Sequence, residues 1–193
     1  MKFIATTTLW ISAGACFYST PAAARLVSAA QAVEPAGATP LSGVRLAGQG
    51  VLRFLGFEIY RARLWVQPGF DADHYAARPL ALELTYHRDF TAEAIAKRSI
   101  EEMRRVGSFT PQQATRWQQA LQAALPDVKS GDRLLGIHQP GVGAVFKMAG
   151  RVVGEVPDAE FSRLFFGIWL SPQTSEPGLR QELLAATRTA GQP

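Results

Sequence analysis

Hydrophobic and polar residues alternate most clearly over residues 48–65, which read GQGVLRFLGFEIYRARLW. The Gly48-Gln49-Gly50 segment predicts a tight turn, and the run of aromatic and branched residues after it predicts a long β-strand. Because successive strand side chains point to opposite faces, Tyr60 and the even-numbered residues are expected on one face and Arg61 and the odd-numbered residues on the other. Neither set is wholly polar, which predicts a strand covered on both faces.

Five further segments have the composition of strands. Leu80–Tyr86 alternates cleanly between apolar and less apolar residues, which predicts a strand with one buried face. Short turns containing glycine or proline join the last three segments, as expected for an antiparallel meander. The five segments are 41–47, 80–86, 133–138, 143–148 and 151–155.

Four segments have the period of helices. Thr91 is placed to cap the first, Ala92–Val106, and Thr110 begins a capping box with Pro111 in the first turn of the second. The remaining two are expected at about 157–168 and 176–186. Strands and helices are therefore segregated along the chain, which predicts an α+β domain.

The first 24 residues have the pattern of a secretory signal peptide. Lys2 precedes a short apolar segment, and three alanines at 22–24 form the small-residue cleavage signal. We therefore expect export to the periplasm or the medium, and no integral membrane span in the mature chain. Cys16 leaves an alternative, in which residues 13–16 are a lipoprotein box and the cysteine carries a lipid anchor.

The rest of the chain is expected to form one domain. Residues 25–40 are rich in alanine and contain two prolines, which predicts a flexible lead-in. The domain is expected over 41–187, with a short tail at 188–193.

Composition and motifs exclude several classes of function. Only 20 basic residues stand against 16 acidic ones, without a run of Lys and Arg, so we expect no nucleic-acid partner. Cys16 is the single cysteine, so the mature chain has neither a disulfide nor a cysteine nucleophile. The motifs of serine hydrolases, zinc proteases, P-loops and dinucleotide-binding folds are absent, and the three histidines are far apart. We therefore expect neither a metal site nor a cofactor.

Cationic and phenolic side chains next to apolar strands are the candidates for ligand binding. A buried arginine is costly unless it meets an anion, so one that faces inward would predict a bound carboxylate. Each residue alone also has an ordinary structural explanation, since Lys97 and Arg98 fit an exposed helix face and Tyr60 fits the core. The candidate ligand-binding residues are Arg53, Tyr60, Tyr86, Arg88 and Lys97.

Several short blocks follow one another from Leu41 to Leu184. The blocks are Gly48-x-Gly50, Phe57-Glu58-Ile59-Tyr60, Ala62-Arg63-Leu64-Trp65, Leu84-Thr85-Tyr86-His87-Arg88-Asp89, Ser130-Gly131-Asp132, Pro140-Gly141-Val142-Gly143, Val156-Pro157-Asp158 and Phe165-Phe166-Gly167-Ile168-Trp169-Leu170. In this order they resemble the chalcone isomerase-like proteins, in particular their exported bacterial branch. The resemblance implies an open-faced β-sandwich, in which a long antiparallel sheet is covered by a layer of helices with an apolar cleft between them.

The resemblance implies less about the chemistry. Plant members cyclise a chalcone to a flavanone with an arginine and with Thr, Tyr and Asn side chains, whereas fatty-acid-binding members hold a carboxylate with an arginine and a tyrosine. Here Leu52 and Leu55 stand at the strand positions, and Thr91 and Arg98 match the helix positions. Arg53 is one residue beyond the expected arginine, which on a strand is the opposite face.

Two functions remain as hypotheses. The first is a non-catalytic periplasmic protein that binds a small apolar or amphipathic anion, of the fatty-acid or phenolic type, with Arg53 or Arg88 and Tyr60 as its polar anchor. The second is an isomerase or intramolecular lyase acting on an aromatic enone, in which Arg53 and Tyr60 stabilise a developing oxyanion. The sequence leaves the identity of the ligand and the oligomeric state open.

Overall fold

The computed structural model describes residues 41–188. The predicted signal peptide at 1–24, the lead-in at 25–40 and all but the first residue of the predicted tail at 188–193 lie outside the described residues.

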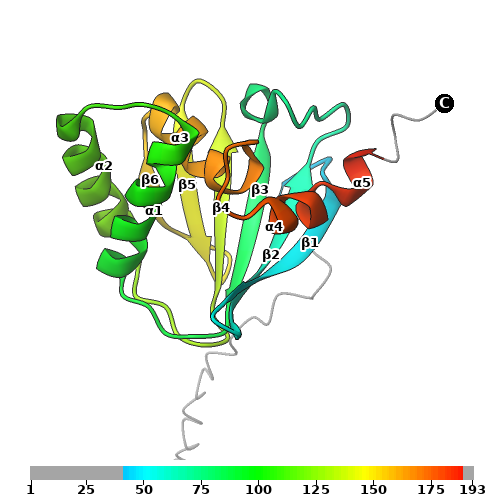
Figure 1. The fold of residues 1–193 in the computed structure, drawn as a ribbon. Helices are drawn as coiled ribbons and strands as arrows, with labels where there is room; N and C mark the ends of the chain where they lie inside the picture. Colours follow the sequence, from blue (N-terminus) through cyan, green and yellow to red (C-terminus); the bar gives the residue numbers. More distant parts are fainter. Residues whose placement is uncertain (1–40, 189–193) are drawn as a thin grey trace, which may run out of the picture. The chain divides into compact units, whose positions relative to one another are not determined.

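A single antiparallel sheet of six strands forms one layer of the domain (Figure 1). Each strand pairs with the next in the chain, so the order across the sheet is β1 to β6. The meander predicted for the last three strands is thus confirmed, and it extends over the whole sheet. The strands are β1 Arg45–Phe54, β2 Phe57–Val66, β3 Leu80–Tyr86, β4 Arg133–Gln139, β5 Gly143–Met148 and β6 Arg151–Val156.

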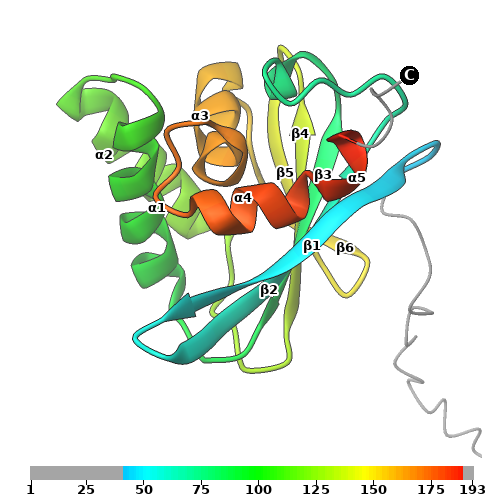
Figure 2. The same ribbon diagram turned by 45° about the vertical axis from the view of Figure 1, so that its right-hand side comes forward.

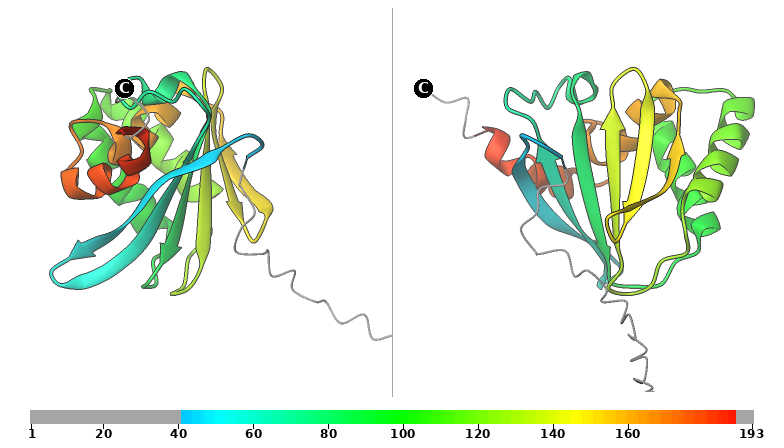
Figure 3. Two further views of the ribbon diagram at one scale, coloured as in Figure 1. Left: turned by 90° about the vertical axis from the view of Figure 1, so that its right-hand side faces the viewer. Right: turned by 180° about the vertical axis from the view of Figure 1, so that it is seen from behind.

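The helices form a second layer on one face of the sheet (Figures 2 and 3). Their starts follow the predicted caps, because Thr91 Oγ1 accepts a hydrogen bond from Ala94 N at 3.1 Å and Thr110 completes its capping box with Gln113. The α+β fold, an antiparallel sheet covered by helices, is confirmed. The helices are η1 Tyr75–Ala77, α1 Ala92–Val106, α2 Pro111–Ala124, α3 Ala159–Leu170, α4 Pro177–Leu183 and α5 Ala185–Arg188.

The core lies between these two layers. Helix α3 is the most apolar helix, and Phe161, Phe165 and Phe166 pack from it onto one another and onto Phe146 of β5. Aromatic side chains bury large areas, so this cluster fixes α3 against the middle of the sheet.

The turn predicted at Gly48-Gln49-Gly50 is wrong. These residues lie inside β1, and the chain turns at Leu55 and Gly56, so the predicted long strand is the hairpin of β1 and β2. Gly48 is required by a distant helix instead: a Cβ there would lie 2.6 Å from the carbonyl oxygen of Leu183 in α4. Glycine at this position lets the helix backbone contact the strand directly.

An irregularity in the hairpin changes which side chains face the helices. Leu52 pairs with Tyr60 and Arg53 with Glu58, so Ile59 is the extra residue of a β-bulge. The strict alternation predicted along this stretch is therefore broken below Tyr60.

Candidate functional site

A cavity of about 470 Å³ lies between the sheet and the helices. Its wall is formed by β1 to β4, by α1, α3 and the start of α4, and by the segment that joins α3 to α4. The wall is mainly apolar, as in most sites for small molecules. Apolar residues of the wall include Leu52, Phe54, Leu84, Phe90, Leu134 and Phe165.

Helix α1 contributes one stripe of its surface to the cavity. Ala94, Arg98 and Glu102 line the wall at intervals of four residues, with Ile95 and Ser99 beside them. Residues four apart lie on the same face of a helix, so the periodicity of α1 places a cation, an anion and small side chains along one side of the cavity.

Two tyrosines lie side by side on the sheet at the cavity wall. Tyr60 of β2 pairs with Tyr86 of β3, and their ring centroids are 6.1 Å apart in an edge-to-face arrangement. The Tyr60 hydroxyl oxygen accepts a hydrogen bond of 2.9 Å from Trp169 Nε1. The Tyr86 hydroxyl makes no hydrogen bond to another residue of the described part of the chain.

Both phenols are held in the neutral form. Burial raises the pKa of Tyr60 and of Tyr86 well above the ordinary tyrosine value of 10.0. For Tyr60 the hydrogen bond from Trp169 opposes this effect, and the negative charges of Glu176 and Glu102 add to it. Each hydroxyl therefore keeps a proton that it can donate to an acceptor in the cavity.

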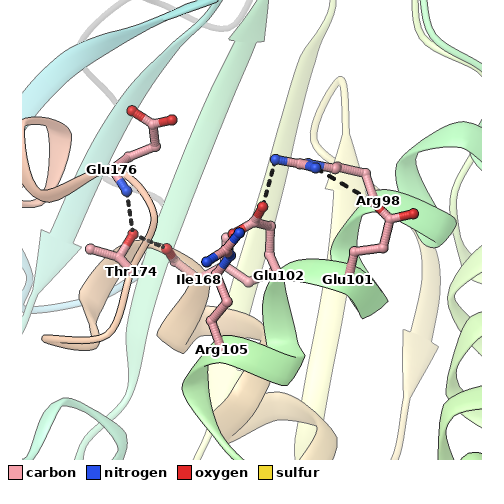
Figure 4. Close-up of polar contacts among 7 residues, drawn as sticks. All are labelled: Arg98, Glu101, Glu102, Arg105, Ile168, Thr174 and Glu176. Atoms are coloured by element: carbon pink, nitrogen blue, oxygen red, sulfur yellow. Dashed lines mark hydrogen bonds and ion pairs between the residues drawn. The ribbon is translucent and has the colours of Figure 1, made fainter.

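Charged side chains of α1 form a cluster beside the cavity (Figure 4). Arg98 Nη2 lies 2.6 Å from Glu102 Oε1, and Arg98 Nη1 lies 3.4 Å from Glu101 Oε2. Glu102 has a second cationic partner, Arg105, whose Nε lies 3.4 Å from Oε2. The side chain of Glu102 is only 8% exposed and that of Arg98 is 67% exposed, so the carboxylate is fixed and the guanidinium is free to reorient.

The segment between α3 and α4 adds a second carboxylate to the wall. The Thr174 hydroxyl donates a 2.6 Å hydrogen bond to the carbonyl of Ile168 and accepts one of 3.1 Å from the backbone N–H of Glu176 (Figure 4). These bonds hold the segment over the cavity, with Glu176 on its wall. Among the described residues, no cation forms an ion pair with Glu176.

The structure brings two of the five predicted site residues together. Tyr60 and Tyr86 both line the cavity, and binding of a ligand by them stays a prediction. Arg53, Arg88 and Lys97 do not belong to the cavity wall.

The positions of these three cations have simple physical reasons. Arg53 lies between Leu52 and Phe54, which both line the cavity, so alternation turns it away, and it pairs with Glu58 at 2.6 Å. Arg88 stacks over the ring of Phe57, with its Cζ 5.0 Å from the ring centroid. Lys97 is exposed on α1, one residue from the stripe that faces the cavity.

The sequence interpretation did not name Arg98, Glu102 or Glu176 as ligand-binding residues. Arg98 was expected on an exposed helix face, and its side chain is 67% exposed, but it also lines the cavity. The spacing of Arg98, Glu102 and Arg105 is a pattern of i, i+3 and i+4 ion pairs, which is equally typical of a solvated helix. Only the position of α1 at the cavity wall distinguishes the two cases.

Within residues 41–188, no group of three His, Cys, Asp or Glu side chains is arranged to hold a metal ion. No helix in that range is both long enough and apolar enough to cross a membrane.

Comparison with known proteins gives three findings. The sequence profile of a family described as chalcone isomerase-like matches residues 28–185. A Haemophilus influenzae protein described as uncharacterized is 28% identical over 133 residues, which are 69% of this chain and 64% of that protein. The chain therefore spans less than two thirds of the length of this relative.

The third finding concerns the fold. The crystal structure of a fatty-acid binding protein from Arabidopsis thaliana superposes with a TM-score of 0.58 at 13% sequence identity, and the match covers 79% of this chain and 92% of that one. At this identity the likeness shows a shared fold.

Proposed function

Because the chain belongs to the chalcone isomerase-like family, we propose that its cavity binds one small amphipathic anion, of the fatty-acid or phenolic type, without transforming it. The observation that carries this proposal is the composition of the cavity wall. Apolar side chains enclose most of the volume, and the polar groups of the wall include two neutral phenols, Arg98, Glu102 and Glu176, with the hydroxyls of Ser99, Thr174 and Ser175. A volume of about 470 Å³ is within the range of sites that enclose a small molecule.

The likeness to a fatty-acid binding protein supports an acyl chain as the apolar part of the ligand. The chain lacks an arginine at the strand position expected from the family, where Leu52 lines the cavity. We therefore assign the anion to the cation that the wall does contain, Arg98.

Arg98 can bind a ligand carboxylate without leaving a buried charge unpaired. Glu102 is held by both Arg98 and Arg105, so it keeps one cationic partner when Arg98 turns to the ligand. The exposed guanidinium reorients at little cost, because it is not packed into the core. The hydroxyls of Tyr60 and Tyr86 supply further donors to the same anion.

The first experiment identifies the ligand and tests its charge. Native mass spectrometry of freshly purified protein should show one bound small molecule per chain. After the ligand is removed, titration with a long-chain fatty acid should give tighter binding than titration with the alcohol of equal length. Arg98→Gln should weaken binding of the acid about tenfold and leave binding of the alcohol unchanged.

Two further variants sharpen this test. Lys97→Gln removes a cation of α1 that lies outside the cavity, and it should leave both affinities unchanged. Glu102→Gln removes the internal competitor for Arg98, so it should strengthen binding of the acid but not of the alcohol.

Several outcomes would contradict the proposal. These are equal affinity for acid and alcohol, equal losses in Arg98→Gln and Lys97→Gln, or no saturable binding of any fatty acid or phenolic. Turnover of a chalcone that is lost in both Tyr60→Phe and Tyr86→Phe would favour an isomerase instead.

We also propose that the protein acts after export, in the periplasm or outside the cell. The support is the pattern of the first 24 residues, with its apolar segment and alanine-rich cleavage site. The intact mass of the exported protein should correspond to a chain that begins at Arg25. An unprocessed chain would contradict this, whereas a chain that begins at a lipidated Cys16 would show an exported protein that is anchored to a membrane.

A further inference from the structure

The tip of the β1–β2 hairpin exposes three large apolar side chains. Phe54, Leu55 and Phe57 are 62%, 81% and 61% exposed, and the tip of the hairpin projects beyond the helices (Figures 2 and 3). Single exposed apolar residues are common on protein surfaces, but three at one projecting turn are a contiguous patch. Such a patch indicates a contact with another surface.

The backbone of the turn points to the same conclusion. Leu55 has a φ of 49° and Gly56 a φ of 81°, as in a type I′ turn, in which both central residues have positive φ. Asparagine, aspartate and glycine suit the first position, whereas leucine is unfavourable there. Leucine is thus unfavourable for the conformation of this turn, and its side chain is exposed instead of packing on the domain. A residue that is unfavourable in both respects is expected where function requires it.

Three exposed arginines lie on β2, just after β3 and on β4. Arg88 stacks on the ring of Phe57. Arg61 and Arg133 lie on either side of Thr85 in the register of β2, β3 and β4, on the sheet face away from the helices. Among the described residues, no carboxylate forms an ion pair with Arg61, Arg88 or Arg133. The apolar tip is thus accompanied by cations that form no ion pair with a carboxylate of the described residues.

We propose that this tip docks onto the surface of an anionic phospholipid bilayer. The aromatic and leucine side chains enter the headgroup region, and the arginines bind lipid phosphates. Phe54 lines the cavity as well as being exposed, so docking brings the cavity wall to the lipid surface. Vesicle binding and ligand binding are measured separately, so the docking proposal can be tested whether or not the cavity binds the proposed ligand.

Co-sedimentation of the purified protein with vesicles tests the surface. Binding should be strong with vesicles of phosphatidylcholine and phosphatidylglycerol, weak with phosphatidylcholine alone, and reduced by salt. Leu55→Asn should reduce binding about tenfold, because it removes one inserted side chain. Arg61→Gln should reduce it about fivefold on the anionic vesicles only.

Leu55→Asn separates docking from folding, because asparagine followed by glycine is the preferred type I′ turn and should not lower the melting temperature. The control is Val142→Asn, which changes a residue that is 58% exposed in the β4–β5 turn and should leave vesicle binding unchanged. Equal binding to both vesicle types, equal effects of the two asparagine variants, or a dimer that Leu55→Asn dissociates would overturn the proposal.

Discussion

Trp169 Nε1 donates a hydrogen bond of 2.9 Å to the hydroxyl oxygen of Tyr60. The bond joins α3 to β2 at the wall of the cavity, and both partners belong to that wall. Because the indole can only donate, the phenol oxygen acts as acceptor and its own proton stays available. The same contact that fixes the two layers therefore orients a donor toward a ligand.

Ionisation of the buried phenols predicts a loss of stability at high pH. Burial raises the pKa of Tyr60 and Tyr86 above the ordinary value of 10.0, so the fold favours the neutral form. The contribution of these phenols to the free energy of unfolding is fully present below pH 10.0. It is lost as the pH rises toward their raised pKa values. Urea unfolding at a series of pH values should show that the free energy of unfolding declines above pH 10.0. The decline should be smaller in the double variant Tyr60→Phe/Tyr86→Phe. An equal slope in the double variant would contradict the assignment.

The close contact of β1 with α4 predicts opposite effects of two glycine substitutions. Gly48→Ala places a methyl group against the backbone of Leu183 and should lower the free energy of unfolding by about 1–3 kcal/mol. Gly178→Ala lies in α4, where an added Cβ meets no atom within 4 Å, and should raise it by about 0.5–1 kcal/mol. Urea denaturation measures both, and a neutral effect of Gly48→Ala would contradict the contact.

Much of the fold could be predicted because its signals are local. Thr91 and the Thr110 capping box define helix starts from neighbouring residues alone. The glycine turn was misplaced because Gly48 is needed by Leu183, which is distant in sequence, and because Leu55 is a poor turn residue. Sequence patterns record local conformation more directly than contacts between distant segments.

The site was less predictable for the same reason. Tyr60 and Tyr86 were found because they are phenols on apolar strands. Ile59 lines the cavity because of a bulge, and the role of Arg98 depends on which side of α1 faces the cavity. Neither feature has a distinct sequence signal.

The carboxylate of Asp158 links two helices, which predicts a large cost for its removal. It caps α3 by accepting from Phe161 N at 2.9 Å and also accepts from Trp117 Nε1 of α2 at 2.8 Å. Burial raises its pKa, but these hydrogen bonds and Arg116 outweigh burial and lower the pKa below its ordinary value. The ionised Asp158 carboxylate therefore stabilises the fold above its ordinary pKa, and this stabilisation is lost as the pH falls toward the lowered pKa.

Asp158→Ala should lower the free energy of unfolding by about 2–4 kcal/mol, because it removes a cap and leaves a buried indole N–H unpaired. The control is Thr91→Ala, which removes only the cap of α1 and should cost about 1 kcal/mol. Urea denaturation of both variants makes the comparison. Equal losses would show that the contact with Trp117 adds nothing.

Burial of His138 predicts a loss of stability below neutral pH. Its Nδ1 lies 2.7 Å from Ser162 Oγ and its Nε2 lies 3.0 Å from the carbonyl oxygen of Ala76. Burial lowers the pKa of His138 below the ordinary value of 6.5, although the bond to Ala76 opposes this, so the unfolded chain binds the proton more tightly. The stabilising contribution is present above pH 6.5 and is lost as the pH falls toward the lowered pKa.

The comparison of wild type with His138→Gln measures this effect. The wild type should lose stability as the pH falls below 6.5, and the variant should lose less over the same change of pH. If the free energy of unfolding falls equally with pH in the wild type and in His138→Gln, the loss of stability in acid comes from other groups.

The central claim is that the acyl part of an amphipathic anion occupies the cavity, and quenching of Trp169 by a brominated fatty acid tests it most directly. Trp169 lines the cavity, whereas Trp65 and Trp117 lie outside its wall. Addition of the brominated acid to ligand-free protein should quench tryptophan fluorescence in a saturable way, with one acid per chain, and Trp169→Phe should abolish most of the quenching. Quenching that does not saturate, or that is unchanged in Trp169→Phe, would contradict the claim.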